Sequence, residues 1–243
     1  MTAVLKRSKD RKVANLANKA GLVAVIANAF GLPSGSDWSC PNQTSICGKI
    51  CYAGKLEKIY KGVREVLMHN YLTLKEASYH RMRDLLDEMI REFETECDKR
   101  GADKVFRIHW DGDFFSHEYT VAWSDVIGTH PAVRFWTYTR VPDSATYLHA
   151  LDHDNLSLYF SADDDNQQTA ASLHSRYGIR IAYLSNTFED AQQKVRSITG
   201  GTAAKCPEQT GQISLISTAG GACVKCGLCV TNKADIAFSI TKK

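Results

Sequence analysis

Four cysteines in the second half of the chain have the spacing of an iron–sulfur binding group. Cys223, Cys226 and Cys229 follow the pattern C-x2-C-x2-C, and Cys206 precedes the first of them by seventeen residues. Three thiolates at such close spacing can bind three irons of one cubane, and a distant fourth thiolate completes the set, as in bacterial ferredoxins. Gly227 lets the backbone turn tightly between two of these cysteines. The group therefore predicts a 4Fe-4S cluster.

A structural zinc ion held by the same four thiolates is the alternative. Zinc ribbons usually supply their thiolates as two closely spaced pairs. Here three of the cysteines are close together in sequence and Cys206 stands apart. The spacing favours the cluster and leaves the zinc site open as a second interpretation.

Three cysteines nearer the start of the chain, Cys40, Cys47 and Cys51, form a second group with the spacing C-x6-C-x3-C. No fourth cysteine lies near them in the sequence, so a cubane held here keeps one iron without a protein thiolate. An open coordination position is where metal chemistry takes place. The alternative is a zinc ion completed by a distant histidine, for which His109 and His117 are the candidates.

The eighth cysteine, Cys97, continues the apolar stripe of a predicted helix and is interpreted as a small core residue. No stretch of the chain reaches the roughly 18 apolar residues of a membrane helix. The basic start is followed by polar residues instead of the apolar run of a signal peptide. We therefore expect a cytoplasmic protein without a membrane partner, whose clustered cysteines are metal ligands and not disulfides.

Strand and helix patterns alternate after residue 104. Short runs rich in β-branched, aromatic and leucine residues predict four buried strands, at Val105–Trp110, Arg134–Thr139, Leu156–Phe160 and Arg180–Leu184. Periodic apolar positions predict helices after them, at residues 119–127, Ser144–His153, Gln167–Tyr177 and Phe188–Ile198. Strand–helix repetition of this kind builds right-handed βαβ units and a parallel sheet.

Three further segments complete the predicted fold. Val63–Arg100 is expected to form one broken helix or two consecutive helices, and Leu22–Ala27 and Ile213–Ile216 are expected to form additional strands. About six strands in an α/β arrangement are enough for a partial or full (β/α) barrel. We expect this β/α domain, with the N-terminal three-cysteine loop, to cover residues 1–200. Residues 201–243 are expected to form a cluster-binding extension.

This order of features resembles the radical S-adenosylmethionine enzymes: a strand, a three-cysteine loop that ends in Cys51-Tyr52-Ala53, β/α repeats and a C-terminal cysteine cluster. The chain more closely resembles the phage gene-product-88 family, a group of radical-SAM-like iron–sulfur proteins. Four segments carry this second resemblance, which covers most of the chain: Ser39–Ala53, Gly112–Phe114, Phe135–Arg140 and Lys205–Pro207.

The resemblance implies a barrel like the radical SAM core, with two 4Fe-4S clusters. The cluster on the three N-terminal cysteines would bind S-adenosylmethionine at its open iron, and the C-terminal cluster would be an auxiliary one. The motif typical of those enzymes is C-x3-C-x2-C, with an aromatic residue before the last cysteine. Here the spacing is longer and Tyr52 follows the last cysteine, a departure that bears on cofactor binding more than on cluster binding.

The resemblance also indicates which residues contact S-adenosylmethionine. Ligands of parallel β/α folds lie at the carboxyl ends of the strands. Gly112 and Asp113 occupy the place of the glycine-rich segment that receives the amino group of the cofactor, and Ser161 or Asp163 the place of the groups that hold its ribose. Arg140 ends a predicted strand and can bind a carboxylate or a phosphate.

Other roles for these strand ends remain open. They can be turn residues and helix caps, for which Asp163–Asp165 are well suited. A side chain can also close the N-terminal site by binding its fourth iron, with His109, Asp111 and Asp113 as the candidates.

Three functions therefore remain open, and one of them is a structural zinc protein. The first is a radical S-adenosylmethionine enzyme with an unknown substrate and an electron donor such as a flavodoxin or ferredoxin. The second is a non-catalytic iron–sulfur module, located in the host cytoplasm if the protein is phage-encoded, that binds a host protein or nucleic acid. The net charge of +3 is too small to indicate a polyanionic partner. The basic run Lys6–Lys12 is interpreted as a solvated or frayed terminus, with a nucleic-acid arm as the alternative.

Overall fold

Six parallel strands form the central sheet of the computed structural model, which describes residues 4–10, 12, 26–217 and 220–241. Their order across the sheet is β1-β2-β3-β4-β8-β5. The strands are β1 (Val105–Ile108), β2 (Arg134–Thr139), β3 (Leu156–Ala162), β4 (Arg180–Ser185), β5 (Ala203–Lys205) and β8 (Asp235–Ser239). The four strands predicted after residue 104 are thereby confirmed, and so is the parallel sheet. Within the described residues, no strand pairing closes this sheet into a barrel.

Helices connect the strands as predicted. They are α5 (His117–Thr129), α6 (Pro142–Ala150), α7 (Gln167–Tyr177) and α8 (Phe188–Thr199). The region upstream forms two helices, α3 (Lys61–Lys75) and α4 (Tyr79–Arg100). Ser78 starts α4 by accepting a hydrogen bond from the Arg81 backbone, and Gly101 ends it in the left-handed region at φ 63°. No helix of the described part is long and apolar enough to cross a membrane.

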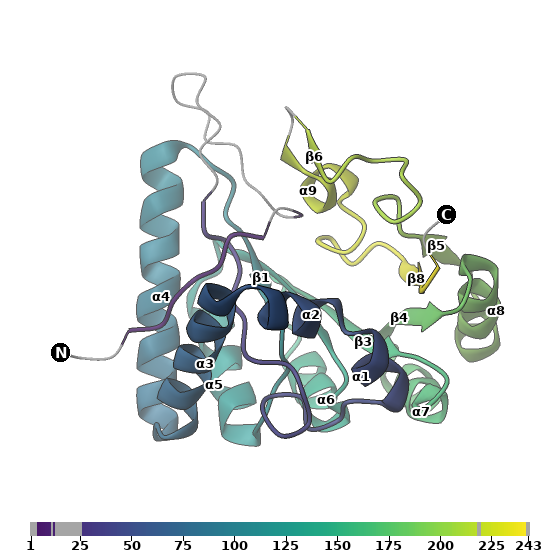
Figure 1. Ribbon diagram of the computed structural model, residues 1–243, viewed down its shortest axis with the longest axis horizontal. Helices are drawn as coiled ribbons and strands as arrows, with labels where there is room; N and C mark the ends of the chain where they lie inside the picture. The colour runs from purple at the N-terminus through teal and green to yellow at the C-terminus, as the bar shows by residue number, and fades with distance from the viewer. Residues whose placement is uncertain (1–3, 11, 13–25, 218–219, 242–243) are drawn as a thin grey trace.

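One face of the sheet packs against these helices. Phe106 of β1 and Phe135 of β2 contact aromatic side chains from α4 and α5, among them Phe93 and Trp123. Farther along the sheet, a second apolar cluster joins β3, β4 and β8 to α7 and α8. Figure 1 shows α4 to α8 along this side of the sheet.

The opposite face is covered by the segment that connects β5 to β8. Side chains alternate between faces along each strand, so Trp136, Tyr138 and Tyr159 point away from the helices and contact this segment. It contains α9 (Ala222–Cys226) and is drawn in yellow-green in Figure 1. Both faces of the sheet are covered, as a parallel sheet requires.

The predicted strand Leu22–Ala27 is displaced. Its residues 22–25 lie outside the described part of the chain. The backbone that runs along the free edge of β1 is Asn28–Leu32, which exchanges hydrogen bonds with it from the Arg107 N–H to the Asn28 carbonyl (3.0 Å) and from the Phe30 N–H to the Arg107 carbonyl (3.0 Å). The pairing amounts to an isolated parallel bridge between Ala29 and Arg107. A short strand-like segment therefore precedes the cysteine loop, a few residues later than predicted.

The prediction of a main-sheet strand at Ile213–Ile216 is wrong. Ile216–Ser217 form β6, which pairs with β7 (Gly220–Gly221) in a separate antiparallel pair. The strands that sequence reasoning missed are β5 and β8, which the residues after 200 add to the central sheet. Three to five residues are too few for an apolar pattern to distinguish a strand from a loop.

The apolar stripe of α4 is confirmed, including Cys97, which is fully buried. Burial raises the pKa of the Cys97 thiol to about 12, so this residue is held as a neutral thiol. We expect Cys97→Ala to lower the free energy of unfolding by about 1 kcal/mol, through the small cavity that it leaves. Urea denaturation of both proteins measures this difference. A variant as stable as the parent would contradict the buried placement.

Candidate metal centres at two cysteine groups

The N-terminal cysteines lie in a loop that follows Asn28–Leu32 and crosses the carboxyl ends of the first strands. Two short helices shape it, α1 (Ser45–Ile50) and α2 (Tyr52–Ile59). Cys47 belongs to α1, and Cys51 is the residue between the two helices. The Cys51 Sγ accepts a hydrogen bond from the Gly54 N–H (3.3 Å), so it caps the start of α2.

Two aspartates that follow β3 hold α1 in place. The Thr44 hydroxyl donates to the Asp163 carboxylate (2.6 Å), and the Ser45 and Ile46 N–H groups donate to Asp165 at 2.9 and 3.3 Å. Free N–H groups at a helix start favour a carboxylate in this position. The interpretation of Asp163–Asp165 as turn and cap residues is confirmed in part: Asp165 caps α1, and the Asp163 carboxylate accepts from the Asp165 N–H (3.1 Å) in a turn. None of them caps the following helix α7, whose N-cap residue is Asn166 with no side-chain cap.

Arg140 forms a buried ion pair with Asp163, at 2.7 Å between its Nη1 and the carboxylate. The same Nη1 donates to the Ser161 carbonyl (3.1 Å). Burial raises the pKa of the Cys47 thiol, and the Arg140 guanidinium beside it opposes that rise. Arg140 therefore connects β2, β3 and a cysteine, instead of offering a free cation at the strand end.

Asp113 fastens the end of β1 to the end of β2. Its carboxylate accepts hydrogen bonds from the Thr139 hydroxyl (2.6 Å), the Arg140 N–H (2.8 Å) and the Phe114 N–H (2.8 Å). Burial raises the pKa of Asp113 to about 6, and the hydrogen bonds limit the rise. Burial also raises the pKa of Cys40, and the negative charge of Asp113 adds to that effect. The Asp113 carboxylate therefore lies close to the first cysteine of the loop.

Gly112 is the point at which the cysteine loop touches β1. Its φ is 80°, a value that favours glycine, and a Cβ there would lie 2.4 Å from the Ser39 Oγ and 2.9 Å from the Leu32 carbonyl oxygen. Ser39 is fully buried and precedes Cys40. The close approach of backbone that the sequence suggested for a cofactor is thus made by the protein itself, and contact of Gly112 with a cofactor stays a prediction.

The three N-terminal thiols are brought together. Besides burial, the charge of Cys47 raises the pKa of Cys40, and the charge of Cys51 raises that of Cys47. The predicted histidine ligands are elsewhere. His109 lies 2.8 Å from the Tyr119 hydroxyl, and its ring centre is 4.6 Å from that of Phe114; burial lowers its pKa to about 3.

The second predicted histidine, His117, begins α5 and packs edge-on against Tyr147. No hydrogen bond or ring contact joins it to the cysteine loop in the described part of the chain. The Nδ1 of His109 has no hydrogen-bond partner within the described residues, and the role of either histidine as a ligand stays a prediction.

The four C-terminal cysteines form the second group, on the face of the sheet opposite the helices. Cys206 follows β5, and Cys223 and Cys226 belong to α9, which ends at Gly227 with φ 70°. Burial raises the pKa of Cys229 to about 12; a hydrogen bond from the Tyr138 hydroxyl opposes this, and the charges of Cys206 and Cys226 add to it. All four predicted ligands are thus gathered beside β2.

Among the described residues, no three His, Cys, Asp or Glu side chains are close enough together to hold one metal ion. All eight cysteines are free thiols.

Two cations beside the C-terminal group were not predicted. Arg107 of β1 is buried, pairs with Asp10 at 2.7 Å and lies over the Trp136 ring, 4.7 Å from its centre. Lys12 pairs with Glu208 at 3.0 Å. A charged residue between Phe106 and Ile108 in an apolar strand was the signal available in the sequence.

Both cations act on the cysteines. Burial and the charge of Cys229 raise the pKa of Cys223, and Arg107 and Lys12 oppose that rise. The sequence indicates a solvated or frayed terminus for the basic start. That interpretation is wrong for Lys12, which forms an ion pair with Glu208. Arg7 likewise pairs with Glu96, at 2.9 Å.

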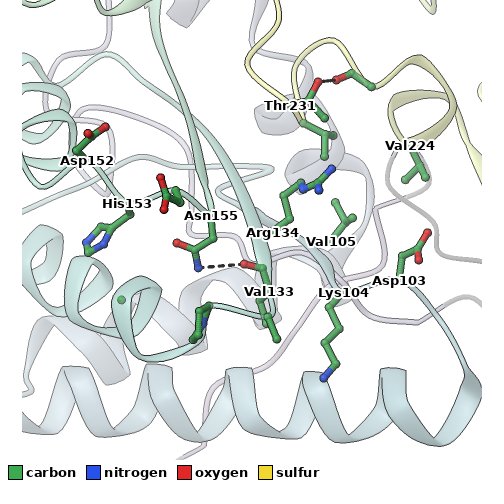
Figure 2. A pocket seen from close by; sticks show the side chains of 16 residues that line it. Asp103, Lys104, Val105, Val133, Arg134, Asp152, His153, Asn155, Val224 and Thr231 are labelled. Atoms are coloured by element: carbon green, nitrogen blue, oxygen red, sulfur yellow. Dashed lines mark hydrogen bonds between the residues drawn. The ribbon is translucent and has the colours of Figure 1, made fainter.

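Two cavities border the cysteine groups. The larger, of about 750 Å³, opens at the amino ends of β1 and β2 and touches the C-terminal group through Val224 and Gly227. Figure 2 shows acidic side chains such as Asp152 on the same cavity as Lys104 and Arg134. The smaller, of about 370 Å³, adjoins Cys51. Because parallel sheets bind ligands at their carboxyl ends, the smaller cavity lies nearer to the expected place.

Asp111 gives the site a pH dependence. It is 4% exposed, and within the described residues its Oδ2 has no hydrogen-bond partner. Burial, and then the charge of Glu57, raises its pKa from 3.8 to about 8. The folded protein thus keeps a proton that the unfolded chain loses, so this group makes stability fall as the pH rises from about 4 to about 8.

We expect Asp111→Asn to remove this dependence and to stabilise the protein more at pH 8 than at pH 5. Urea denaturation at the two pH values measures the effect. Asp154→Asn, at an exposed aspartate, is the matched control and should change neither value. Equal effects of Asp111→Asn at both pH values would show that the carboxyl is not held protonated.

No solved structure matches the chain, so the comparison with known proteins rests on sequence. The chain is 50% identical over 244 residues to the Gene 88 protein of Mycobacterium phage L5, covering 99% of this chain and 100% of that protein. It is 49% identical over 245 residues to the Gene 88 protein of Mycobacterium phage D29, with the same coverage. The profile of the family described as Gene product 88 matches residues 3–232. The chain therefore belongs to the Gene product 88 family.

Proposed function

We propose that this protein is an iron–sulfur protein with two 4Fe-4S clusters. Cys206, Cys223, Cys226 and Cys229 hold one of them, and Cys40, Cys47 and Cys51 hold the other. The observation that carries the proposal is the sorting of the thiols. Seven cysteines gather in two groups at the sheet, whereas Cys97 is buried apart from them in α4.

The donor set fits such clusters. Thiolates are the ligands that iron–sulfur clusters use. Around one zinc ion, thiolate sulfurs about 2.3 Å from the metal lie within about 4 Å of each other. The thiolates of a cubane bind separate irons and stand farther apart than those around one zinc ion. What favours the cluster over zinc is the sequence spacing, with three cysteines close together and Cys206 apart.

The charge balance supports the same assignment. A cubane with four thiolates is an anion, and burying an anion is costly unless cations lie near it. Arg107 and Lys12 both act on Cys223, and both are tied down by acidic partners, Asp10 and Glu208. Because each cation is also paired with a carboxylate, the two offset the charge of a cluster on the C-terminal group only in part.

The N-terminal group would hold a cluster with one iron free of protein thiolates. S-adenosylmethionine is the ligand that the radical SAM resemblance indicates for that iron, and its reductive cleavage is the chemistry that the cluster would supply. Arg140 would keep Cys47 as a thiolate, and Asp163 would keep Arg140 and the loop in position. In this proposal, the six-stranded sheet and the segment Asn28–Leu32 along the edge of β1 correspond to a partial (β/α) barrel like that of the radical SAM enzymes.

A second candidate function is a module that keeps the clusters as structural elements and binds a partner. One observation favours it: the polar groups at the strand ends are engaged within the protein. Hydrogen bonds or ion pairs already engage the carboxylates of Asp113 and Asp163 and the guanidinium of Arg140. Among the predicted cofactor residues with a polar side chain, Ser161 on β3 is half-buried and has no side-chain hydrogen bond to another described residue.

Metal content tests the clusters. Protein purified without oxygen should be brown and should contain about eight irons per chain. Cys51→Ala and Cys229→Ala should each reduce this to about four, because each removes a ligand of one group only. Cys97→Ala is the matched control and should leave the iron unchanged. Stoichiometric zinc without iron would refute the proposal.

Electron paramagnetic resonance tests the open iron. In the reduced protein, S-adenosylmethionine should alter the signal of one cluster and leave the other unchanged. The effect should vanish in Cys51→Ala, whereas Cys229→Ala should retain it. A reduced N-terminal cluster whose spectrum ignores the cofactor would favour the binding module over the enzyme.

A further inference from the structure

The cavity of about 370 Å³ beside Cys51 is lined by an unusual set of side chains. Helices α1, α2 and α3 each contribute at least one cation to it, and an aromatic residue comes from the loop before α1. The residues that matter are Trp38, Lys49, Cys51, Lys55, Lys58 and Arg64. Its volume is that of a site for a small organic molecule or for one unit of a polymer.

The cations of this cavity form no ion pairs within the described residues, although the charge of Lys49 helps to lower the pKa of the exposed Asp165. Lys49, Lys55, Lys58 and Arg64 are exposed, and none of them forms a salt bridge with another described residue. Glu57 is the acidic residue of the lining, and its carboxylate accepts hydrogen bonds from the Ser34 N–H (2.9 Å) and hydroxyl (2.5 Å).

This cavity lies in one of two strongly basic parts of the sequence. Residues 49–64 contain five basic residues and one acidic residue, a net charge of +4, whereas the whole chain carries +3. Residues 6–12 also carry +4, but Arg7 and Lys12 are paired there with Glu96 and Glu208. Four of the five cations in residues 49–64 line the cavity, where they attract an anion.

Trp38 gives the cavity a surface on which a planar ring can stack. It is 39% exposed, and its ring forms a T-shaped contact with Tyr71, at 6.0 Å between ring centres. Tyr71 is buried and packs in turn against Phe115, so the indole is supported from below. Aromatic side chains beside cations are how proteins bind single-stranded nucleic acids, because every base presents a face for stacking.

We propose that this cavity binds single-stranded nucleic acid, with one base stacked on Trp38 and phosphates bound by Lys49, Lys55, Lys58 and Arg64. The cavity holds one nucleotide, yet its cations are spread over three helices, which suits successive phosphates of a strand better than a free nucleotide. The bound nucleotide lies beside Cys51. The claim that the bound nucleic acid is a substrate rests on the proposed N-terminal cluster. The claim that the cavity binds nucleic acid does not depend on that cluster.

Fluorescence anisotropy with a labelled oligo(dT) of about 15 nucleotides, long enough to span a typical single-strand site, tests the proposal on the full-length protein purified without oxygen. Four phosphate contacts predict that the logarithm of the binding constant falls against the logarithm of the salt concentration with a slope of about −2.8. Lys55→Gln combined with Lys58→Gln should bring the slope to about −1.4. Trp38→Ala should weaken binding about tenfold at an unchanged slope, because it removes stacking and no charge.

Two controls make the result specific. Lys99→Gln combined with Arg176→Gln removes two exposed cations from α4 and α7 and should leave binding unchanged. Iron is measured in every sample, and melting temperatures verify that each variant is folded. Binding without iron would overturn the proposed function and support this site. Eight irons without binding, or a double lysine variant that binds like the parent, would overturn this site alone. Competition by ATP as strong as that by the oligonucleotide would overturn the choice of a strand.

Discussion

The carboxylate of Asp163 is the constraint on which the N-terminal site depends. It is fully buried at the end of β3, and it accepts from Arg140 of the neighbouring strand and from Thr44 of the cysteine loop. Removing one partner of a buried ion pair costs about 3–5 kcal/mol, because the other charge is left in the protein interior without compensation. The strand end, the guanidinium and the loop are therefore held as a unit. Cys47 takes its position from that unit, and Asp113 extends it to β1.

Most of the sheet and its helices can be predicted from the sequence, because long periodic patterns determine them. The strand at Arg134–Thr139 and the helix at Gln167–Tyr177 have the predicted bounds, and α4 buries the predicted stripe. The elements that the sequence did not predict are short, or they depend on contacts between distant parts of the chain. Strands β5 and β8 are brief, and their place in the sheet depends on partners far away in the chain. Asp165 is a helix cap, as the sequence suggested, but the helix that it caps begins 120 residues earlier, a pairing that local sequence patterns cannot show.

Cysteine spacing was sufficient to find both groups of thiols, but it says nothing about what surrounds them. The two cations near Cys223, the buried Arg107 and the partly exposed Lys12, come from β1 and from the start of the chain. Only the folded structure shows that these cations lie near Cys223. The same holds for the cavity beside Cys51: its lysines carry no signal in the sequence, and they line one cavity with Trp38 only when α1, α2 and α3 are placed together. Charge in a sequence can be counted, whereas its concentration on one surface is a property of the folded molecule.

The strand order has a consequence for assembly. β5 touches the sheet only through β8, although β8 comes later in the chain, with the C-terminal cysteines in between. When β4 has formed, a gap one strand wide separates it from β5, and the connection must fold back to insert β8. The same reversal brings Cys206 together with the three cysteines around α9. Completing the sheet and gathering these thiols are thus a single cooperative event. A ligand that bound the four sulfurs would therefore also stabilise the pairing of β8 with β4 and β5.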